Sequence, residues 1–510
     1  MKHIAAIALC ATLCNALAAV TLLDGERSFD VDFSGGVPPA SFQTDMKTSG
    51  HLAAKGEISF DLFIEDASLF VVGYVYLGSG GGWYLHGLAP EKNGEWETFR
   101  FPVSSLGVEG TPAGLDKIHT IRLVLRRGGR GKGVVKIRNV VCSDTVSPGL
   151  TEAERHERVA TERARILAMP GKKGERRFAW CHTAYGPYKG DWDRAVREVK
   201  DLGFTDLIVN LCWGVNSAYG SNVLPTAKAL DEYGDLLEKC KTACRSHGIK
   251  FHVWRMCWRI AEWYTPKEEV DAMEAEGLLQ RNTGGQVLRK WLCPTNPKNR
   301  KREAAALLEL ASKGVDGIQF DTIRYASYDT CFCEGCRKMF EKRIGRTLSD
   351  SWNLEIWNDE SLKKEWRDFR AEVISSLVRG VSKRVHEQYP GVEVSAAVFF
   401  DPVEDRNGSG QDWSGWCREG LLDFACPMDY SSSALMFRSR LRVQNEYRRN
   451  TPFYPGIGLS IFPSDGREAG RAADQIAAVR EEGFGGFTVF QYEAKTIEIL
   501  KLLSEGPCGL

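Results

Sequence analysis

The chain has 510 residues, which suggests a large domain beside a small one, and its 43% hydrophobic content can bury a full core. Lysine plus arginine and aspartate plus glutamate each number 67, so the formal net charge is zero. This balance gives the protein no overall attraction to nucleic acid or to anionic membranes, and we expect neither as a partner.

The first 18 residues have the pattern of a secretory signal peptide. Lys2 and His3 precede an apolar run at 4–13, and Ala16-Leu17-Ala18 has the small residues of a cleavage site. No later run approaches the roughly 18 apolar residues of a membrane-spanning helix. We therefore expect an exported protein, periplasmic or extracellular, without membrane insertion.

Residues 19–145 alternate between apolar and polar side chains with a period of two, as at Ile58, Phe60 and Leu62. Glycine-rich turns separate these runs, so the pattern predicts half-buried strands in an antiparallel β-sandwich. The stretch 96–106 resembles a strand of jelly-roll carbohydrate-binding modules.

Three residues of the predicted sandwich are candidates for stacking on a sugar: Trp83, Tyr84 and His86. Aromatic faces pack well against the C–H faces of pyranose rings. The alternative is that these side chains belong to the core or to an interface of the domain.

Residues 146–175 are charged and helical in composition, and we interpret them as a helical linker. From 176 to 510 strand patterns alternate with helix patterns, which predicts parallel strands with crossover helices. The predicted strands are 178–182, 205–213, 250–258, 317–325, 392–400, 422–430, 453–460 and 487–492. Eight strands, nearly all preceded by a helix, favour an α/β fold of the (β/α)8 TIM-barrel type over an open doubly wound sheet. No nucleotide-binding glycine motif follows any of them.

Polar and aromatic residues gather at the predicted C-terminal ends of these strands, where TIM barrels carry their chemistry. They are His182, Tyr185, Asn210, Trp213, Trp254, Trp258, Asp321, Arg324, Tyr325, Asp401, Asp429, Tyr430, Gln491 and Glu493. Carboxylates among aromatic rings suit a carbohydrate, because acids transfer protons and rings form platforms for sugars. We expect the aspartates to be catalytic and the other residues to bind substrate.

Three segments, 316–325, 411–430 and 454–459, resemble blocks of the glycosyl hydrolase-like family ten proteins, also called the domain of unknown function 187 group. The resemblance covers roughly 176–500. It implies an exported bacterial glycoside hydrolase of TIM-barrel fold, in a group whose substrates are poorly charted.

Catalytic roles follow from similarity to barrel glycosidases. An aspartate at the end of the fourth strand is commonly the nucleophile there, which implies this role for Asp321. The sixth-strand Asp429 is then the first candidate for acid/base, with Asp401 as the second. Retention needs the two carboxyl groups about 5 Å apart, whereas inversion needs a wider gap. Arg324 either orients Asp321, holds an acidic group of the sugar, or forms a purely structural ion pair.

Cys331, Cys333 and Cys336 have the spacing of metal ligands, and Cys293 is the candidate for a fourth. Four thiolates bind zinc tetrahedrally and leave no open position, so the expected role is structural. The segments around them are similar to those that hold zinc in family forty-two β-galactosidases. The alternative is a disulfide such as Cys331 to Cys336, which export would allow.

Together these features predict a secreted glycoside hydrolase that cleaves O-glycosidic bonds of a poly- or oligosaccharide. We expect a carboxylate pair at the barrel mouth, a retaining mechanism and no cofactor for catalysis. The alternative is a non-catalytic glycan-binding protein with a degenerate barrel. Nothing in the sequence predicts an oligomeric state.

Overall fold

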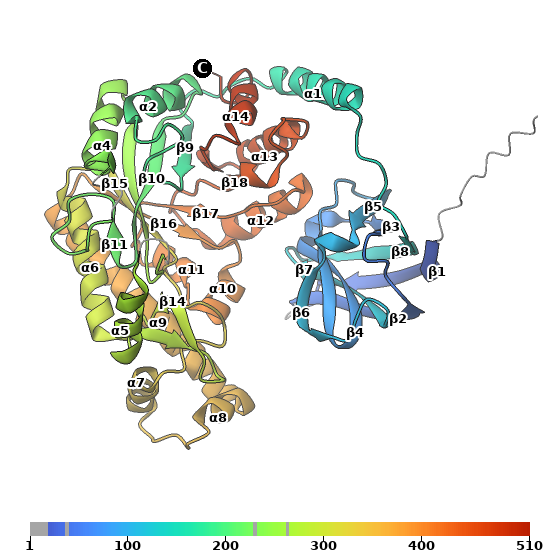
Figure 1. Ribbon diagram of the computed structural model, residues 1–510, viewed down its shortest axis with the longest axis horizontal. Coiled ribbons are helices and arrows are strands. Elements are labelled where there is room, and N and C mark those ends of the chain that lie inside the picture. Colours follow the sequence, from blue (N-terminus) through green and yellow to red (C-terminus); the bar gives the residue numbers. More distant parts are fainter. Residues whose placement is uncertain (1–18, 36–39, 228–231, 262–264, 510) are drawn as a thin grey trace, which may run out of the picture. The chain divides into compact units, whose positions relative to one another are not determined.

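The computed structural model of the chain describes residues 19–35, 40–227, 232–261 and 265–509. The chain forms two compact units, Met1–Leu150 and Thr151–Leu510 (Figure 1). The predicted signal peptide, 1–18, lies outside the described residues. Within the described ranges, no helix combines the length and the apolar character needed to cross a membrane.

The first unit is a β-sandwich of two antiparallel four-stranded sheets with strand orders β1-β8-β3-β5 and β2-β7-β4-β6. Its strands are β1 (Ala19–Asp32), β2 (Ser41–Gly50), β3 (Glu57–Ile64), β4 (Phe70–Leu88), β5 (Trp96–Pro102), β6 (Gly107–Pro112), β7 (Ile118–Arg127) and β8 (Lys132–Ser143). Ile58, Phe60 and Leu62 are each 1% exposed, because every second residue of β3 faces the opposite sheet. The predicted antiparallel sandwich is confirmed.

The second unit is a barrel of parallel strands in the order β17-β16-β15-β12-β10-β9-β19-β18. A parallel bridge between Ala425 and Phe453 joins its two ends. The barrel strands are β9 (Arg176–Cys181), β10 (Asp206–Trp213), β12 (Lys250–Met256), β15 (Gly317–Asp321), β16 (Glu393–Val398), β17 (Phe424–Pro427), β18 (Gly456–Gly458) and β19 (Gly486–Phe490). The predicted (β/α)8 barrel is confirmed.

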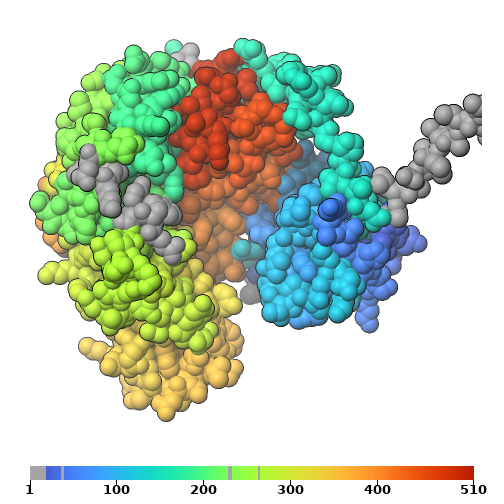
Figure 2. All heavy atoms as spheres, in the orientation of Figure 1, coloured from blue at the N-terminus to red at the C-terminus, as the bar shows by residue number. Residues whose placement is uncertain are grey.

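Helices surround the barrel, and two short strand pairs extend its loops (Figure 1). The helices are α1 (Glu152–Leu167), α2 (Trp192–Asp201), α4 (Leu236–His247), α5 (Lys267–Ala275), α6 (Pro297–Ser312), α7 (Glu334–Ile344), α8 (Trp352–Asn358), α9 (Glu360–Gln388), α10 (Pro402–Ser409), α11 (Trp413–Arg418), α12 (Ala434–Tyr447), α13 (Ala469–Glu481) and α14 (Ile497–Ser504). The short strands are β11 (Asn216–Ser217), which pairs with β10, and the hairpin of β13 (Leu279–Arg281) and β14 (Val287–Leu292). Helices α7 and α8 project as a lobe at one end of the barrel unit (Figure 2).

Helix α1 lies within the predicted helical linker, 146–175, and packs on the barrel unit. Ile166 is fully buried in the barrel core, and Arg163 forms an ion pair with Glu505 at 2.8 Å.

The period of two decides which side chains enter the barrel. On β9, Phe178 and Trp180 point into the interior, whereas Ala179 and Cys181 pack against the surrounding helices. On β15, Ile318 and Phe320 belong to the outer layer. Because successive side chains alternate, Asp321 points into the barrel.

A cluster of charges fills the opposite, N-terminal end of the barrel. Arg176 forms ion pairs with Asp206 at 2.5 Å and with Glu393 at 2.9 Å. Burial by itself raises the pKa of Asp206, but hydrogen bonds from His252 and Arg176 lower it to about 2. Asp206, His252 and Glu393 lie close enough to hold a metal ion, but Arg176 already supplies the compensating charge.

Candidate active site

A cavity of about 340 Å³ lies at the C-terminal ends of the barrel strands. It is lined by Trp180, His182, Trp254, Met256, Arg259, Trp291, Asp321, Thr322, Arg324, Ala397, Met428, Tyr430 and Phe490. Concave sites rich in aromatic rings with a few converging polar groups are typical of ligand-binding pockets. Asp321 and four of the predicted binding residues line this cavity, namely His182, Trp254, Arg324 and Tyr430.

Asp321 is 5% exposed and is held by three groups. The indole Nε1 of Trp254 donates to Oδ2 at 2.9 Å, and the backbone N–H of Thr322 donates to Oδ1 at 2.5 Å. The guanidinium of Arg324 lies 3.8 Å from Oδ1. Burial raises the pKa of Asp321, while Arg324 and the two N–H donors oppose this rise. The carboxyl group is thus fixed in one orientation at the cavity wall.

His182 lies between aromatic rings beside Asp321. Its ring contacts Trp213 at 4.8 Å and Trp254 at 5.3 Å between ring centroids, both edge to face. Burial lowers the pKa of His182, and the charges of Asp321 and Glu493 oppose this shift. The carboxylates of Asp321, at the end of the fourth strand, and of Glu493, after the eighth, thus both favour the protonated form of His182.

Two arginines bring positive charge to the same cavity. The Arg324 guanidinium stacks on Phe399 at 4.2 Å, and that of Arg259 lies 5.1 Å from the ring of Trp291. Nη1 of Arg324 is buried and has no hydrogen-bond partner among the described residues. Burial lowers the pKa of Arg324, whereas the charge of Asp321 favours its protonated form. Asp321 is the only carboxylate among the residues that line the cavity.

Asp429, predicted as the acid/base, does not line the cavity. It is fully buried, and its Oδ1 accepts a hydrogen bond from Gln444 of α12 at 2.6 Å. Its neighbours Met428 and Tyr430 do line the cavity, so Asp429 points to the opposite side of the chain. Burial raises the pKa of Asp429 to about 7. The structure does not bring Asp429 together with Asp321 in the cavity.

Asp401, the second acid/base candidate, also lies outside the cavity lining. Its side chain accepts hydrogen bonds from the backbone N–H groups of Val403 and Glu404, so it caps the N-terminus of α10.

The other predicted binding residues divide by burial. Gln491 supports the site, because its Oε1 accepts the backbone N–H of His182 at 3.1 Å, and Glu493 is half-buried nearby. Asn210 is fully buried inside the barrel, and neither of its amide atoms has a hydrogen-bond partner among the described residues. Three aromatic residues predicted to bind substrate instead pack in the outer layer: Tyr185, Trp258 and Tyr325.

Several cavity residues were not predicted, namely Trp180, Met256, Arg259, Trp291, Thr322, Ala397, Met428 and Phe490. Strand alternation indicates some of them: Trp180 lies two residues before His182, and Met256 two residues after Trp254. No comparable sequence signal indicates Arg259 and Trp291, because a bridge between the loop after β12 and β14 places them.

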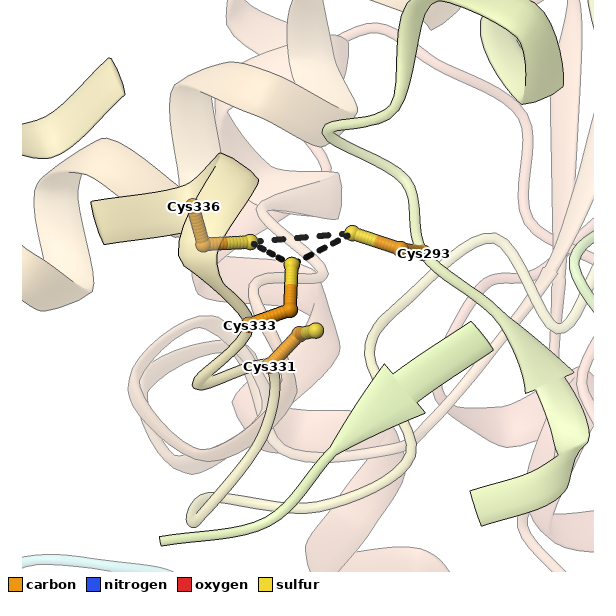
Figure 3. Close-up of side chains that lie close together, drawn as sticks. All are labelled: Cys293, Cys331, Cys333 and Cys336. Atoms are coloured by element: carbon orange, nitrogen blue, oxygen red, sulfur yellow. Dashed lines mark hydrogen bonds between the residues drawn. The ribbon is translucent and has the colours of Figure 1, made fainter. Parts of the chain in front are cut away.

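The four predicted metal ligands come together in the structure. Cys293 precedes α6, while Cys331, Cys333 and Cys336 lie around the N-terminus of α7, and all four thiols point to a common centre (Figure 3). Their sulfur atoms lie within 4.8 Å of one another. The separations are 3.7 Å for Cys293–Cys333 and 3.6 Å for both Cys293–Cys336 and Cys333–Cys336.

These separations fit a metal ion better than a disulfide. Tetrahedral Zn–S bonds of about 2.3 Å place their sulfur atoms roughly 3.8 Å apart, whereas a disulfide needs about 2.0 Å. All four cysteines are free thiols, so the alternative of a Cys331–Cys336 disulfide is not what the structure shows. The cluster has the donor set and the geometry to hold a metal ion.

The cysteine cluster is connected to the segment that carries Asp321. The thiol of Cys336 donates to Thr295 Oγ1 at 3.0 Å, and the same oxygen is 3.0 Å from the hydroxyl of Tyr325. Tyr325 follows Asp321 by four residues. The cluster therefore anchors the loop after β15.

Comparisons with known proteins agree with this architecture. The glycoside hydrolase domain of PgaB (BpsB) from Bordetella bronchiseptica has a TM-score of 0.50 at 13% identity, covering 65% of this chain and 99% of its own. An exo-β-agarase has a TM-score of 0.50 at 9% identity, covering 96% of this chain and 97% of its own. PfGH50B gives the same TM-score and identity, with 96% and 98% covered. At such identities the likeness shows the fold alone.

A search of curated proteins found no match. A family model described as Glycosyl hydrolase-like 10 matches residues 195–457, just over half of the chain. The match includes Asp321 and the four clustered cysteines. The chain therefore belongs to the Glycosyl hydrolase-like 10 family.

Proposed function

We propose that this protein is an exported glycoside hydrolase in which Asp321 is the catalytic carboxylate of the fourth barrel strand. The observation that carries the proposal is the setting of Asp321, a buried carboxyl group fixed by Trp254, Thr322 and Arg324 in an aromatic cavity at the barrel mouth. Family membership and the glycosidase folds of the structural neighbours support it. Export rests on the sequence pattern of residues 1–18.

A glycosidase needs a second carboxyl group. Glu493 is our candidate in place of Asp429, although, like Asp429, it is not among the residues that line the cavity. Glu493 follows β19, which lies opposite β15 in the eight-stranded ring. Its carboxylate has no hydrogen bond or ion pair among the described residues. Its negative charge, like that of Asp321, favours the protonated form of His182. In this scheme one carboxyl group protonates the leaving oxygen while the other assists attack at the anomeric carbon.

The stereochemical outcome then depends on the gap between Asp321 and Glu493. A separation of roughly 6.5–9.5 Å leaves room for a water molecule and supports inversion, whereas about 5 Å supports retention. The expected retaining mechanism relied on Asp321 and Asp429, whose side chains face different sides of the barrel wall. Analysis of the anomeric form of the first product by NMR distinguishes the two mechanisms.

The cavity also bears on the kind of sugar that is bound. Aromatic residues such as Trp180 and Tyr430 offer faces for pyranose rings. Arg259 and Arg324 also line the cavity, and guanidinium groups suit acidic groups of a glycan.

A second candidate function is glycan binding without catalysis. The specific observation in its favour is that Asp321 has no carboxylate partner among the residues that line the cavity. A degenerate barrel of this kind would keep its aromatic platform and lose hydrolysis.

The deciding experiment measures release of reducing ends from a panel of acidic and neutral glycans, agarose included. We expect cleavage by the wild type, a loss of roughly three or more orders of magnitude in Asp321→Asn, and at least about a hundredfold loss in Glu493→Gln. Glu498→Gln is the matched control, because Glu498 is 67% exposed on α14 and should be dispensable. Cleavage that survives Asp321→Asn would remove this residue from the mechanism. Glycan binding by the wild type without any cleavage would establish the second candidate.

We further propose that the four clustered cysteines hold a structural zinc ion. Four protein thiolates complete a tetrahedral shell and leave no position for substrate, so such an ion would stabilise the loop after β15 and take no part in the reaction.

A further inference from the structure

The outward face of one sandwich sheet carries a row of aromatic and charged side chains. Asp45 of β2, Arg122 of β7 and Tyr76 of β4 are paired side by side across three neighbouring strands. Residues opposite each other in an antiparallel pair project to the same face. Alternation places Tyr74 beside Tyr76, and their ring centroids are 6.0 Å apart.

Trp83 completes this row from the far half of β4. Its ring meets Tyr76 edge to face at 6.1 Å, and the Arg122 guanidinium lies 4.1 Å from the ring centroid. Arg122 is itself held by two hydrogen bonds to Asp45, at 2.6 and 2.7 Å. A side chain at Gly78 would collide with Trp83, since a Cβ there would lie 2.9 Å from Cζ3 of the indole. Trp83 is thus a fixed, half-buried ring.

Hydrogen-bonding groups on this face remain unused. The hydroxyls of Tyr74 and Tyr76 and the carboxylate of Glu109 make no hydrogen bond within the described part of the chain. Glu109 is exposed and is paired with Trp83 across β4 and β6. The face therefore alternates rigid rings with free donors and acceptors.

The opposite sheet provides a close comparison. There Trp96 is also half-buried, with the Arg138 guanidinium 4.0 Å from its ring centroid. Its aromatic neighbour is Phe63, which has no hydroxyl, and the carboxylate of Asp61 already accepts hydrogen bonds from Thr98, Arg138 and Asn139. An arginine stacked on tryptophan thus occurs on both faces, but unused polar groups beside several rings distinguish the face of Trp83.

We propose that the face formed by Tyr74, Tyr76, Trp83, Glu109 and Arg122 binds a glycan chain. Pyranose rings present apolar C–H faces and a rim of hydroxyl groups, which matches rings interleaved with free acceptors and donors. A protein partner would need a larger apolar area than three half-buried rings. The choice of a glycan rests in part on the proposed function, because a barrel that acts on a polysaccharide gains effective concentration from a second glycan site on the same chain.

This face differs from the site expected from the sequence. Trp83 belongs to it, but His86 does not, because its ring stacks on Phe101 at 4.0 Å with an interplanar angle of 1°. Tyr84 and His86 project to the other side of β4 from Trp83.

The test uses the full chain carrying Asp321→Asn, so that bound glycan is not cleaved. Affinity electrophoresis in gels containing agarose, xylan, glucomannan or hyaluronan, and sedimentation with chitin and cellulose, measure binding. We expect retention by at least one of these probes, and a loss of affinity of at least about tenfold in Trp83→Ala. Tyr76→Phe removes only a hydroxyl and tests the site without threatening the fold. Trp96→Ala is the matched control and should keep the affinity.

Absence of binding to all six probes, unchanged binding in both Trp83→Ala and Tyr76→Phe, or an equal loss in Trp96→Ala would overturn the proposal. The barrel is tested separately, by reducing-end release from soluble glycans. Cleavage that persists in Trp83→Ala while binding is lost supports both sites. Binding by a wild type that cannot cleave, lost in Trp83→Ala, supports this face and contradicts the proposed hydrolase.

Discussion

Replacement of Asp429 by asparagine should stabilise the protein, and increasingly so as the pH rises. Asp429 is fully buried beside α12, and burial raises its pKa from an ordinary value of 3.8 to about 7, against the opposing effects of Arg440 and Gln444. Its Oδ2 has no hydrogen-bond partner among the described residues. Asparagine keeps the oxygen that accepts from Gln444 and mimics the protonated acid.

The magnitude follows from linkage between protonation and folding. An acid whose pKa is raised in the folded state destabilises the fold wherever the unfolded chain is ionised. The wild type should therefore lose stability relative to Asp429→Asn between about pH 4 and pH 7. The rise in the pKa of Asp429 corresponds to a loss of folding stability of about 4 kcal/mol at pH 8 and of less than about 1 kcal/mol at pH 4. The value at pH 8 is an upper limit, because water that enters the protein would solvate the buried charge.

Chemical denaturation of both proteins at pH 4 and pH 8 measures this difference. The variant should also keep its activity, since Asp429 does not line the cavity. A stability difference that does not grow with pH would refute the assigned burial of the carboxyl group. A collapse of activity with the fold intact would return Asp429 to the mechanism.

Three further predictions follow from particular contacts. Trp254→Phe removes the N–H that donates to Asp321 but keeps an aromatic ring, so kcat should fall by roughly ten- to a hundredfold with a smaller change in KM; steady-state kinetics with an unchanged kcat would contradict this role. Elemental analysis should find one zinc ion per chain. Cys333→Ser should lower both the zinc content and Tm, whereas Cys417→Ser, outside the cluster, should retain the metal. A metal-free wild type would exclude a zinc site. Glu303→Ala removes the carboxylate that pairs with the fully buried Arg255 at 2.6 Å, and should destabilise the fold by about 3–5 kcal/mol in denaturant unfolding. Glu498→Ala breaks an exposed ion pair with Lys501 and should change stability by less than about 1 kcal/mol. Equal losses of stability in Glu303→Ala and Glu498→Ala would show that burial does not determine the effect of removing one partner of an ion pair.

The fold follows from local patterns that a single sequence displays. Alternation at Ile58, Phe60 and Leu62 predicts a half-buried strand, because a sheet exposes one face to the core and the other to solvent. Apolar runs separated by helices predict the parallel barrel for the same reason, since strands covered on both faces need helical crossovers. The cysteine cluster was also predictable, because three of its ligands lie within six residues of sequence.

The composition of the site depended on three-dimensional packing. Side-chain parity separates Asp321, which enters the cavity, from Asp429, which faces α12, although both follow barrel strands. Which of two alternating side chains faces the barrel interior is known only once the strand is placed relative to the barrel axis. A bulge such as that between Asn210 and Cys212 shifts the alternation.

Loops were the second limit on prediction from sequence. Arg259 and Trp291 enter the cavity through a bridge between separate loop segments, and Glu493 comes near His182 only because the eighth strand lies beside the first. The sequence by itself determined the two folds, the position of Asp321 and the thiolate cluster, since these depend on local periodicity and spacing. Closure of the barrel decided which groups surround Asp321, because that depends on contacts between residues far apart in the chain.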